Sequence, residues 1–185
     1  MTAPTLDTPT AAPSPTAVWK RIVVLALMIV LAAFWVWALF FASKEAVNRI
    51  DDRSWAARAE RICASIDERR EALADYTRID VADPALIQRR PDVVDAATDL
   101  LDEMLAEVAA VRPSDPKGAA IVPDWLDDYR TYLSDRRAYA EELRRTSQNA
   151  PFYETAEQGI PLSERIATFA GDNEMPSCSP PRDLS

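Results

Sequence analysis

The stretch from residue 91 to residue 113 reads PDVVDAATDLLDEMLAEVAAVRP, and it indicates the fold class of the chain. Apolar side chains recur in it every three or four residues, which is the repeat of one face of an α-helix. Pro91 and Asp92 suit a helix start, and Arg112-Pro113 ends the pattern. We therefore expect a helix from about Pro91, whose apolar seam consists of Val94, Ala97, Leu101, Met104, Val108 and Val111.

The same repeat appears on both sides of this stretch. Upstream, no helix breaker lies between residue 43 and Pro84. Downstream, we expect a loop at PSDPKG, a third helix from Pro123, and a short fourth helix that stops at Gly171. No β-hairpin signal is evident, so the pattern predicts an all-α fold, an antiparallel three- or four-helix bundle. The three further seams are Trp55, Ala59, Ile62, Ile66, Leu73 and Tyr76; Leu126, Tyr129, Leu133, Ala140 and Leu143; and Leu162, Ile166 and Phe169.

A long apolar run lies near the N-terminus. Residues 22–43 carry no charge, and as a helix they would be about 33 Å long, enough to cross the hydrocarbon core of a bilayer. A cleaved signal peptide fits less well, because the run is long and Phe40 would occupy the −3 position of a cleavage site. We expect an uncleaved transmembrane helix at 18–43, which is also the start of one long helix reaching about Thr77.

The remaining boundaries follow from composition. Residues 1–17 are rich in Thr, Pro and Ala without apolar periodicity, so we expect a disordered tail. Residues 44–185 would form the helical bundle domain, with an irregular C-terminal tail.

The orientation of the predicted span rests on two opposing signals. Basic residues are more numerous after the span than before it, and that count alone would place the C-terminal domain in the cytoplasm. The chain's only two cysteines suit an oxidising compartment instead. We expect a single-pass protein of the cell membrane with a cytoplasmic N-terminus and an extracytoplasmic C-terminal domain.

Composition excludes much chemistry. The chain has no histidine, which removes Ser-His and Cys-His catalysis and His-ligated metals. Its three glycines are too few for a phosphate-binding loop. Only Asp7 of the 30 acidic residues, and only Lys20 and Arg21 of the 21 basic ones, precede residue 44, so the predicted domain carries a formal charge of −10. A nucleic-acid partner is therefore not expected.

Cys63 borders the seam of the first helix, and Cys178 lies in the proline-rich tail. Redox-active pairs usually lie close together in sequence at a helix end. These two are far apart, so we expect a structural disulfide that holds the tail against the first helix. Closing so long a loop contributes on the order of 4 kcal/mol in the chain-entropy model. In a cytoplasmic domain both would be ordinary thiols.

Other candidate sites have plainer interpretations, and we predict no catalytic, cofactor-binding or metal-binding residue. Ser114 and Lys117 match the S-x-x-K spacing of serine acyl enzymes, but Pro116 interrupts the required turn. The segment GDNE at 171–174 is too short for a calcium loop. One face of the helix quoted above could bind a cation or a basic partner, although such a face is usually only solvated. Its residues are Asp92, Asp95, Asp99 and Asp102.

Aromatic and arginine side chains also fall on or beside the seams. A stripe at heptad spacing could be a partner groove but is expected to be core, with at least two of its members buried; it comprises Trp125, Tyr132 and Tyr139. Arg69 and Arg136 fall at positions of the helical repeat where an apolar, core-facing residue is expected. Either one pairs with Glu107, or both extend to the surface.

The ending GIPLSERIATFAGDNEMPSCSPP carries a recognisable pattern, a G-x-P helix followed by an N-x-M-x-x-C-x-P-P tail. It resembles uncharacterised single-pass membrane proteins of high-GC Gram-positive bacteria. The resemblance implies an anchored architecture and a cysteine partner for Cys178, and it carries no activity. The matching residues are Gly159, Pro161, Asn173, Met175, Cys178, Pro180 and Pro181.

These features lead to one expected function and two alternatives. We expect a membrane-anchored, non-enzymatic helical module that binds or scaffolds another envelope protein, with the lipid bilayer and a protein of unknown identity as its partners. The alternatives are a sensory or regulatory subunit that signals through the continuous first helix, and an enzyme that uses carboxylates. No cofactor is expected.

Overall fold

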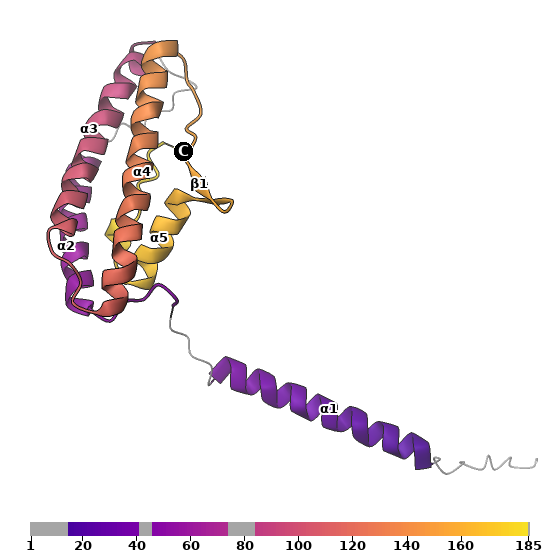
Figure 1. Cartoon of the computed structure of the whole chain (residues 1–185). Coiled ribbons are helices and arrows are strands. Elements are labelled where there is room, and N and C mark those ends of the chain that lie inside the picture. The colour runs from indigo at the N-terminus through magenta and orange to yellow at the C-terminus, as the bar shows by residue number, and fades with distance from the viewer. Residues whose placement is uncertain (1–14, 41–45, 74–83, 185) are drawn as a thin grey trace, which may run out of the picture. The chain divides into compact units, whose positions relative to one another are not determined.

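The computed structural model describes residues 15–40, 46–73 and 84–184 of the chain. It divides into two compact units, residues 1–45 and residues 46–185 (Figure 1). The fold class predicted from the sequence is confirmed, since an apolar N-terminal helix is followed by a second unit made almost entirely of packed helices.

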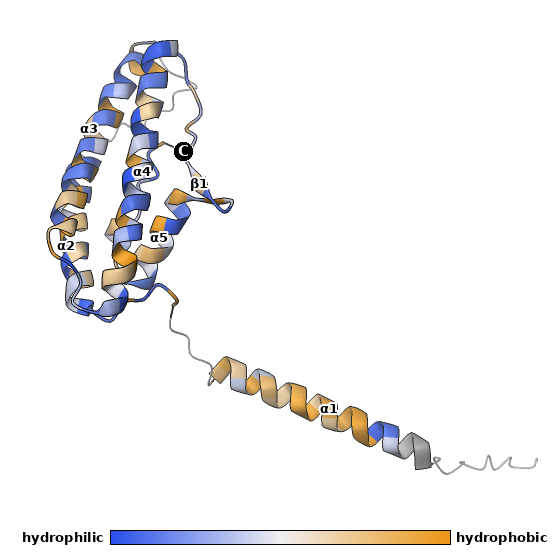
Figure 2. Ribbon diagram, in the orientation of Figure 1, coloured by the Kyte–Doolittle hydropathy of each residue, from blue (hydrophilic) through white to orange (hydrophobic). Residues whose placement is uncertain are grey.

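The first unit contains one helix, α1 (Pro15–Phe40). Its stretch Trp19–Phe40 has a mean hydropathy of 2.8, and none of its most apolar part is buried. Figure 2 shows hydrophobic residues along most of its length. By length and composition, this helix is able to cross a membrane. Residues 15–17, expected in a disordered tail, are instead helical, while residues 1–14 and 41–43 lie outside the described residues.

The second unit is built from four helices, α2 (Arg53–Glu71), α3 (Pro84–Ala109), α4 (Pro116–Thr146) and α5 (Leu162–Asp172). Helix α3 packs along α4 in antiparallel fashion, with α2 against α3 and α5 against α4 (Figure 1). A short 3-10 turn, η2 (Pro176–Cys178), returns to α2. The expected bundle is therefore present, and its chain ends in a segment that packs back onto its first helix.

The predicted seams form the core of the second unit. All seam residues of α4 and α5 are buried, and those of α3 are buried except Val111. In α2, Trp55, Ala59 and Ile66 are buried and Ile62 is partly buried. Leu73 lies beyond the end of α2 and is 42% exposed, and Tyr76 lies outside the described residues. Trp125 stacks on Phe169 with ring centroids 5.2 Å apart and meets Trp55 edge-on at 6.5 Å. The aromatic stripe of α4 is core, as expected, because Trp125, Tyr132 and Tyr139 are all buried.

The prediction of one continuous helix from the anchor to Thr77 is wrong. Residues 46–52 are not helical, and α2 begins only at Arg53. Asp52 caps it, because the carboxylate accepts a hydrogen bond from the backbone N–H of Trp55 at 2.9 Å. The helix ends at Glu71, before the predicted end. An aspartate can lie inside a helix or cap one, and apolar spacing does not distinguish the two cases.

Two predicted helix starts are also wrong, for a shared reason. Pro91 and Pro123 were expected at first turns, but both lie inside helices that begin at Pro84 and Pro116. An interior proline removes one backbone hydrogen bond, so a sequence pattern predicts a break there. Each helix instead starts at an earlier proline, whose missing N–H costs nothing in a first turn. The expected loop PSDPKG thus contains the beginning of α4.

The segment before α5 holds a hairpin that was not predicted. Strands β1 (Ala156–Glu157) and β2 (Ile160–Pro161) pair antiparallel. Gln158 and Gly159 between them have φ values of 53° and 81°, the left-handed conformations that a tight two-residue hairpin turn requires. With only two residues in each strand, no alternating pattern was available to reveal it.

The expected glycine cap of α5 is wrong as well. Gly171 lies within the helix, which ends one residue later and is capped by Asn173. The left-handed residue of this turn is Glu174, with φ 60°. Asn173 is fully buried and belongs to the contacts that hold the C-terminal segment.

Candidate functional site

The C-terminal segment, residues 173–184, is attached to α2 at several points. A disulfide bond joins Cys63 to Cys178, whose α-carbons lie 5.1 Å apart. Beside it, the hydroxyl and backbone N–H of Ser177 donate to the two carboxylate oxygens of Glu60 at 2.7 and 3.0 Å. The structure thus brings together the two residues proposed as a structural pair and supplements the bond with polar contacts.

Asn173 ties the same segment to the entry of the unit. Its side-chain oxygen accepts from the N–H of Ile50 at 2.9 Å, and its amide nitrogen donates to the carbonyls of Asn48 and Phe169 at 2.9 Å each. One buried amide therefore satisfies three backbone groups from two separate segments. Asn173 belongs to the GDNE segment, which is too short for a calcium loop, and its structural role was not predicted from the sequence. A buried asparagine has no periodic signal that would have revealed one.

Arg136 makes the most buried charged contact of the described residues. Its guanidinium forms two hydrogen bonds to the carboxylate of Asp183, at 2.7 and 2.9 Å, and its Nε donates to the hydroxyl of Thr98 at 3.0 Å. The Arg136 side chain has no solvent exposure. Both expectations for this residue are wrong, because it neither pairs with Glu107 nor extends to the surface.

Burial and pairing act in opposite directions on these two charges. Burial alone would lower the pKa of Arg136, but the hydrogen bonds and charge of Asp183 outweigh it and raise that pKa above its usual value. Burial likewise favours the neutral form of Asp183, and Arg136 nevertheless holds its pKa below the usual value. Both groups are therefore charged at neutral pH, and each depends on the other.

Arg69, the other inward arginine, pairs at the surface. Its two terminal nitrogens donate to the carboxylate of Glu103 at 2.7 and 2.9 Å, and both side chains are about half exposed. Glu107, the partner proposed from the sequence, lies one helical turn farther along α3. Its backbone carbonyl accepts a hydrogen bond from Arg58.

The acidic face of α3 is partly exposed, but solvent is not its only partner. Arg144 of α4 contacts Asp92 and Asp95 at 2.9 and 2.5 Å. Arg137 contacts Asp99 at 3.0 Å and also Asp102. The interpretation of a merely solvated face is therefore corrected, because all four carboxylates pair with arginines of the neighbouring helix. A free cation would have to compete with those arginines.

The S-x-x-K segment joins two helix starts. Ser114 donates both its hydroxyl and its backbone N–H to Asp52, at 2.7 and 2.8 Å, and Asp115 accepts from the N–H of Asp52 at 3.1 Å and from that of Gly118 at 2.7 Å. Hydrogen bonds from Ser54, Ser114 and Trp55 hold the pKa of Asp52 well below its usual value. The Ser114 hydroxyl is therefore engaged by Asp52, the residue that caps α2. Among the described residues, no cluster of three or more acidic or cysteine side chains could hold a metal ion.

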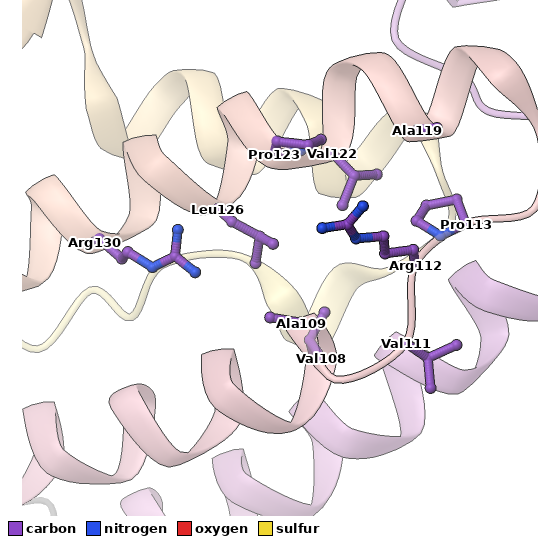
Figure 3. A pocket seen from close by; sticks show the side chains of 10 residues that line it. All are labelled: Val108, Ala109, Val111, Arg112, Pro113, Ala119, Val122, Pro123, Leu126 and Arg130. Carbon is purple, nitrogen blue, oxygen red and sulfur yellow. The ribbon is translucent and has the colours of Figure 1, made fainter.

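A groove of about 380 Å³ lies between the end of α3 and the first half of α4 (Figure 3). Its apolar wall includes the core residues Val108, Val122 and Leu126. Two arginines line it as well. Arg112 follows α3, and Figure 3 shows its guanidinium directed toward Leu126, while the guanidinium of Arg130 lies on the other side of Leu126. Sequence reasoning missed this groove, because its two walls come from different helices.

Of the two arginines that line the groove, only one has its charge balanced by an ion pair with a described residue. Arg130 forms an ion pair with Asp127 one turn earlier on α4, at 2.5 Å. Arg112 is exposed and makes no hydrogen bond or ion pair with any residue that the structure describes. An anion in the groove would therefore meet one uncompensated cation.

Comparison with known proteins gives no further assignment. No protein family model, no curated protein and no solved structure matches this chain.

Proposed function

We propose that the chain is a membrane-anchored, non-enzymatic helical module that binds or scaffolds another protein of the bacterial envelope. Helix α1 would be its single transmembrane span, with the N-terminus in the cytoplasm and the second unit outside. The observation that carries this proposal is the joining of an apolar helix to a disulfide-closed helical unit over a short stretch of chain. The ten residue-to-residue steps from Phe40 to Ile50 span at most about 36 Å, so the second unit would stay near the membrane.

A disulfide favours an external location for the second unit, because cytosolic thiols are kept reduced. The acidic surface and the absence of histidine agree with a role in binding rather than in catalysis. The groups that suggested chemistry also have structural partners: Ser114 donates its hydroxyl to Asp52, the N-cap of α2, and the α3 carboxylates pair with Arg137 and Arg144. The enzyme alternative loses its main motive, since it depended on free carboxylates.

The sensory alternative depended on a rigid connection from the anchor into the bundle. The non-helical residues 46–52 interrupt that connection. A signal carried by rotation or translation of one helix would have to pass through this break, so the anchor acts better as a tether. A binding module requires only a tether.

Photo-crosslinking in intact cells tests the proposal. A photoreactive amino acid replaces Tyr153, an exposed aromatic residue before the hairpin, and in parallel Arg61, an exposed residue of α2. The expected result is a discrete protein adduct at one position whose other component is an envelope protein. Chain recovered from the soluble fraction would refute the anchor. A third position for the photoreactive amino acid is Val47, which is also exposed. Membrane-bound chain that gives no protein adduct at any of the three positions would refute the proposal of a partner protein.

A further inference from the structure

The groove between α3 and α4 combines two properties that one class of ligand satisfies together. Its lining is largely apolar, with Val111, Ala119 and Pro123 exposed and Val108, Val122 and Leu126 almost fully buried. Its cations are guanidinium groups, which bind carboxylates and phosphates through paired hydrogen bonds. A purely apolar ligand would make no use of the charge of Arg112, and a simple inorganic anion would make no use of the apolar lining. An amphiphile with an anionic head would contact both.

The charge of the groove is unusual for this unit. Residues 44–185 carry a formal charge of −10, and most arginines near the α3–α4 contact are neutralised by aspartates or glutamates. Arg112 is an exception, because it follows α3 with no acidic partner among the described residues. The groove is therefore lined by two arginines and no acidic residue on an otherwise acidic unit, and an anion is the ligand that Arg112 would attract.

The size of the groove limits how much of a ligand enters. A volume of about 380 Å³ lies at the small end of the range for small-molecule sites, which is roughly 300–1,000 Å³. That space accommodates a headgroup and the adjoining part of an acyl chain, and not a whole lipid. The remainder of the ligand must extend from the open side of the groove.

The short connection between α1 and α2 indicates the source of such a ligand. Its rim is attached to the start of α2, since Trp55 donates its ring N–H to the carbonyl of Val111 at 2.7 Å and Ser114 donates to Asp52 at 2.7 Å. Only twelve residues separate Phe40, the end of α1, from Arg53, the start of α2. If α1 spans a bilayer, the length of this chain limits the distance from Phe40 to Arg53 to at most about 5 nm. The local supply of anionic amphiphile would then be the membrane itself.

We propose that this groove binds the headgroup of an anionic phospholipid from the membrane that holds α1, with Arg112 as the main contact of the phosphate. This proposal rests on the anchoring part of the proposed function and is independent of the partner protein. Arg130 contributes less, because Asp127 already compensates its charge. The aliphatic wall contacts the glycerol and the first part of the acyl chain.

The test uses the full chain reconstituted in zwitterionic lipid nanodiscs. A photoreactive phosphatidylglycerol is added to one sample and a photoreactive phosphatidylcholine to another, with the reactive group next to the headgroup. Crosslinked peptides are identified by mass spectrometry. We expect adducts from phosphatidylglycerol within residues 108–130 and far fewer from phosphatidylcholine. Arg112→Glu should reduce the phosphatidylglycerol adducts about tenfold, the effect of losing one charge-assisted contact.

Arg61→Glu is the matched control, because it makes the same charge change on an exposed side chain of α2 outside the groove. It should leave labelling unchanged, and circular dichroism checks that both variants stay folded. If the glutamate variant does not fold, the milder change Arg112→Gln replaces it in the test. Arg112→Gln should also reduce labelling by phosphatidylglycerol. Co-elution of the chain with the nanodiscs separately reports the anchor. Chain that fails to co-elute therefore overturns the proposed function, whereas embedded chain with an unlabelled groove overturns this inference alone.

Three further outcomes contradict the proposal. Equal labelling by both lipids would mean that charge does not select the ligand. Labelling that survives Arg112→Glu would place the lipid elsewhere. Competition by inorganic phosphate as effective as that by short-chain phosphatidylglycerol would indicate a phosphate site with no role for the aliphatic wall.

Discussion

Arg136 of α4 and Asp183 of the C-terminal segment form a two-point ion pair, with N–O distances of 2.7 and 2.9 Å, and the arginine side chain is fully buried. Asp183 lies five residues beyond Cys178 in sequence, and the pair connects the C-terminal segment to α4, which packs against both α3 and α5. The C-terminal segment is therefore held by a covalent bond to α2 and by a buried ionic contact to α4. Breaking each in turn separates their contributions.

Asp183→Asn should destabilise the second unit by about 3–5 kcal/mol, because it leaves the buried guanidinium of Arg136 without its counter-charge. Denaturant unfolding monitored by circular dichroism measures the change. Replacing both residues, as Arg136→Met with Asp183→Leu, should restore much of the loss, since the uncompensated charge is then gone. A double variant as unstable as the single one would argue against an uncompensated charge as the cause.

Cys178→Ser should lower the free energy of unfolding by roughly 2–5 kcal/mol and leave the helical content nearly unchanged. The bond closes a loop between residues 115 positions apart, and it holds a segment that makes few helical hydrogen bonds of its own. A reducing agent should produce the same loss in the unaltered chain and none in the variant. If a reducing agent lowered the stability of the unaltered chain and of the Cys178→Ser variant equally, the loss would not come from the disulfide.

Leu101→Asp and Leu133→Asp should each unfold the second unit, because each places a charge without a partner in the core. Asp99→Ala should cost less than about 1 kcal/mol, as expected for one exposed ion pair with Arg137. Thermal melts of the three variants provide the comparison. Similar small effects in all three would mean that the helix faces are assigned wrongly.

Stability should be nearly constant between pH 8 and pH 5 and should fall below about pH 4. The pKa values of Asp52 and Asp183 are lowered in the folded state, so the stability they contribute is present above the unfolded carboxyl pKa of about 3.9 and is lost as the pH falls through their folded values. The chain has no histidine to add a transition near neutrality. Unfolding midpoints from pH 8 to pH 2 measure this profile, and Asp52→Asn should flatten its acid side. A main decline between pH 8 and pH 5 would contradict the assignment.

A cysteine placed at Lys117, which is exposed at the start of α4, should react with a membrane-impermeant maleimide in intact cells. The expectation follows from the proposed external location, since both native cysteines are bonded to each other and do not compete for the reagent. The unaltered chain serves as the control and should remain unlabelled. Labelling that appears only after lysis would place the second unit in the cytoplasm.

The apolar seams could be predicted from sequence because the helical repeat places every third or fourth residue on one face within a few turns. Val94 and Leu133 needed no knowledge of the rest of the chain to be assigned to the core. The apolar length of α1 was equally local information. The helix starts were less accessible, since Asp52 and Pro91 are each compatible with two local conformations and the surrounding packing selects one.

The helical repeat of apolar residues around Arg136 predicted that this arginine faces the core, but it did not predict which acidic residue pairs with it. That partner, Asp183, lies 47 residues away in a segment without periodicity, and it reaches Arg136 only because the C-terminal segment folds back over the bundle. The groove between Val108 and Leu126 has the same origin, since its walls come from different helices. The sequence by itself determined which faces are buried, because that information repeats within single helices. Only the tertiary structure decided which charges meet, because a buried charge takes its counter-charge from whichever distant segment the packing brings within hydrogen-bond distance.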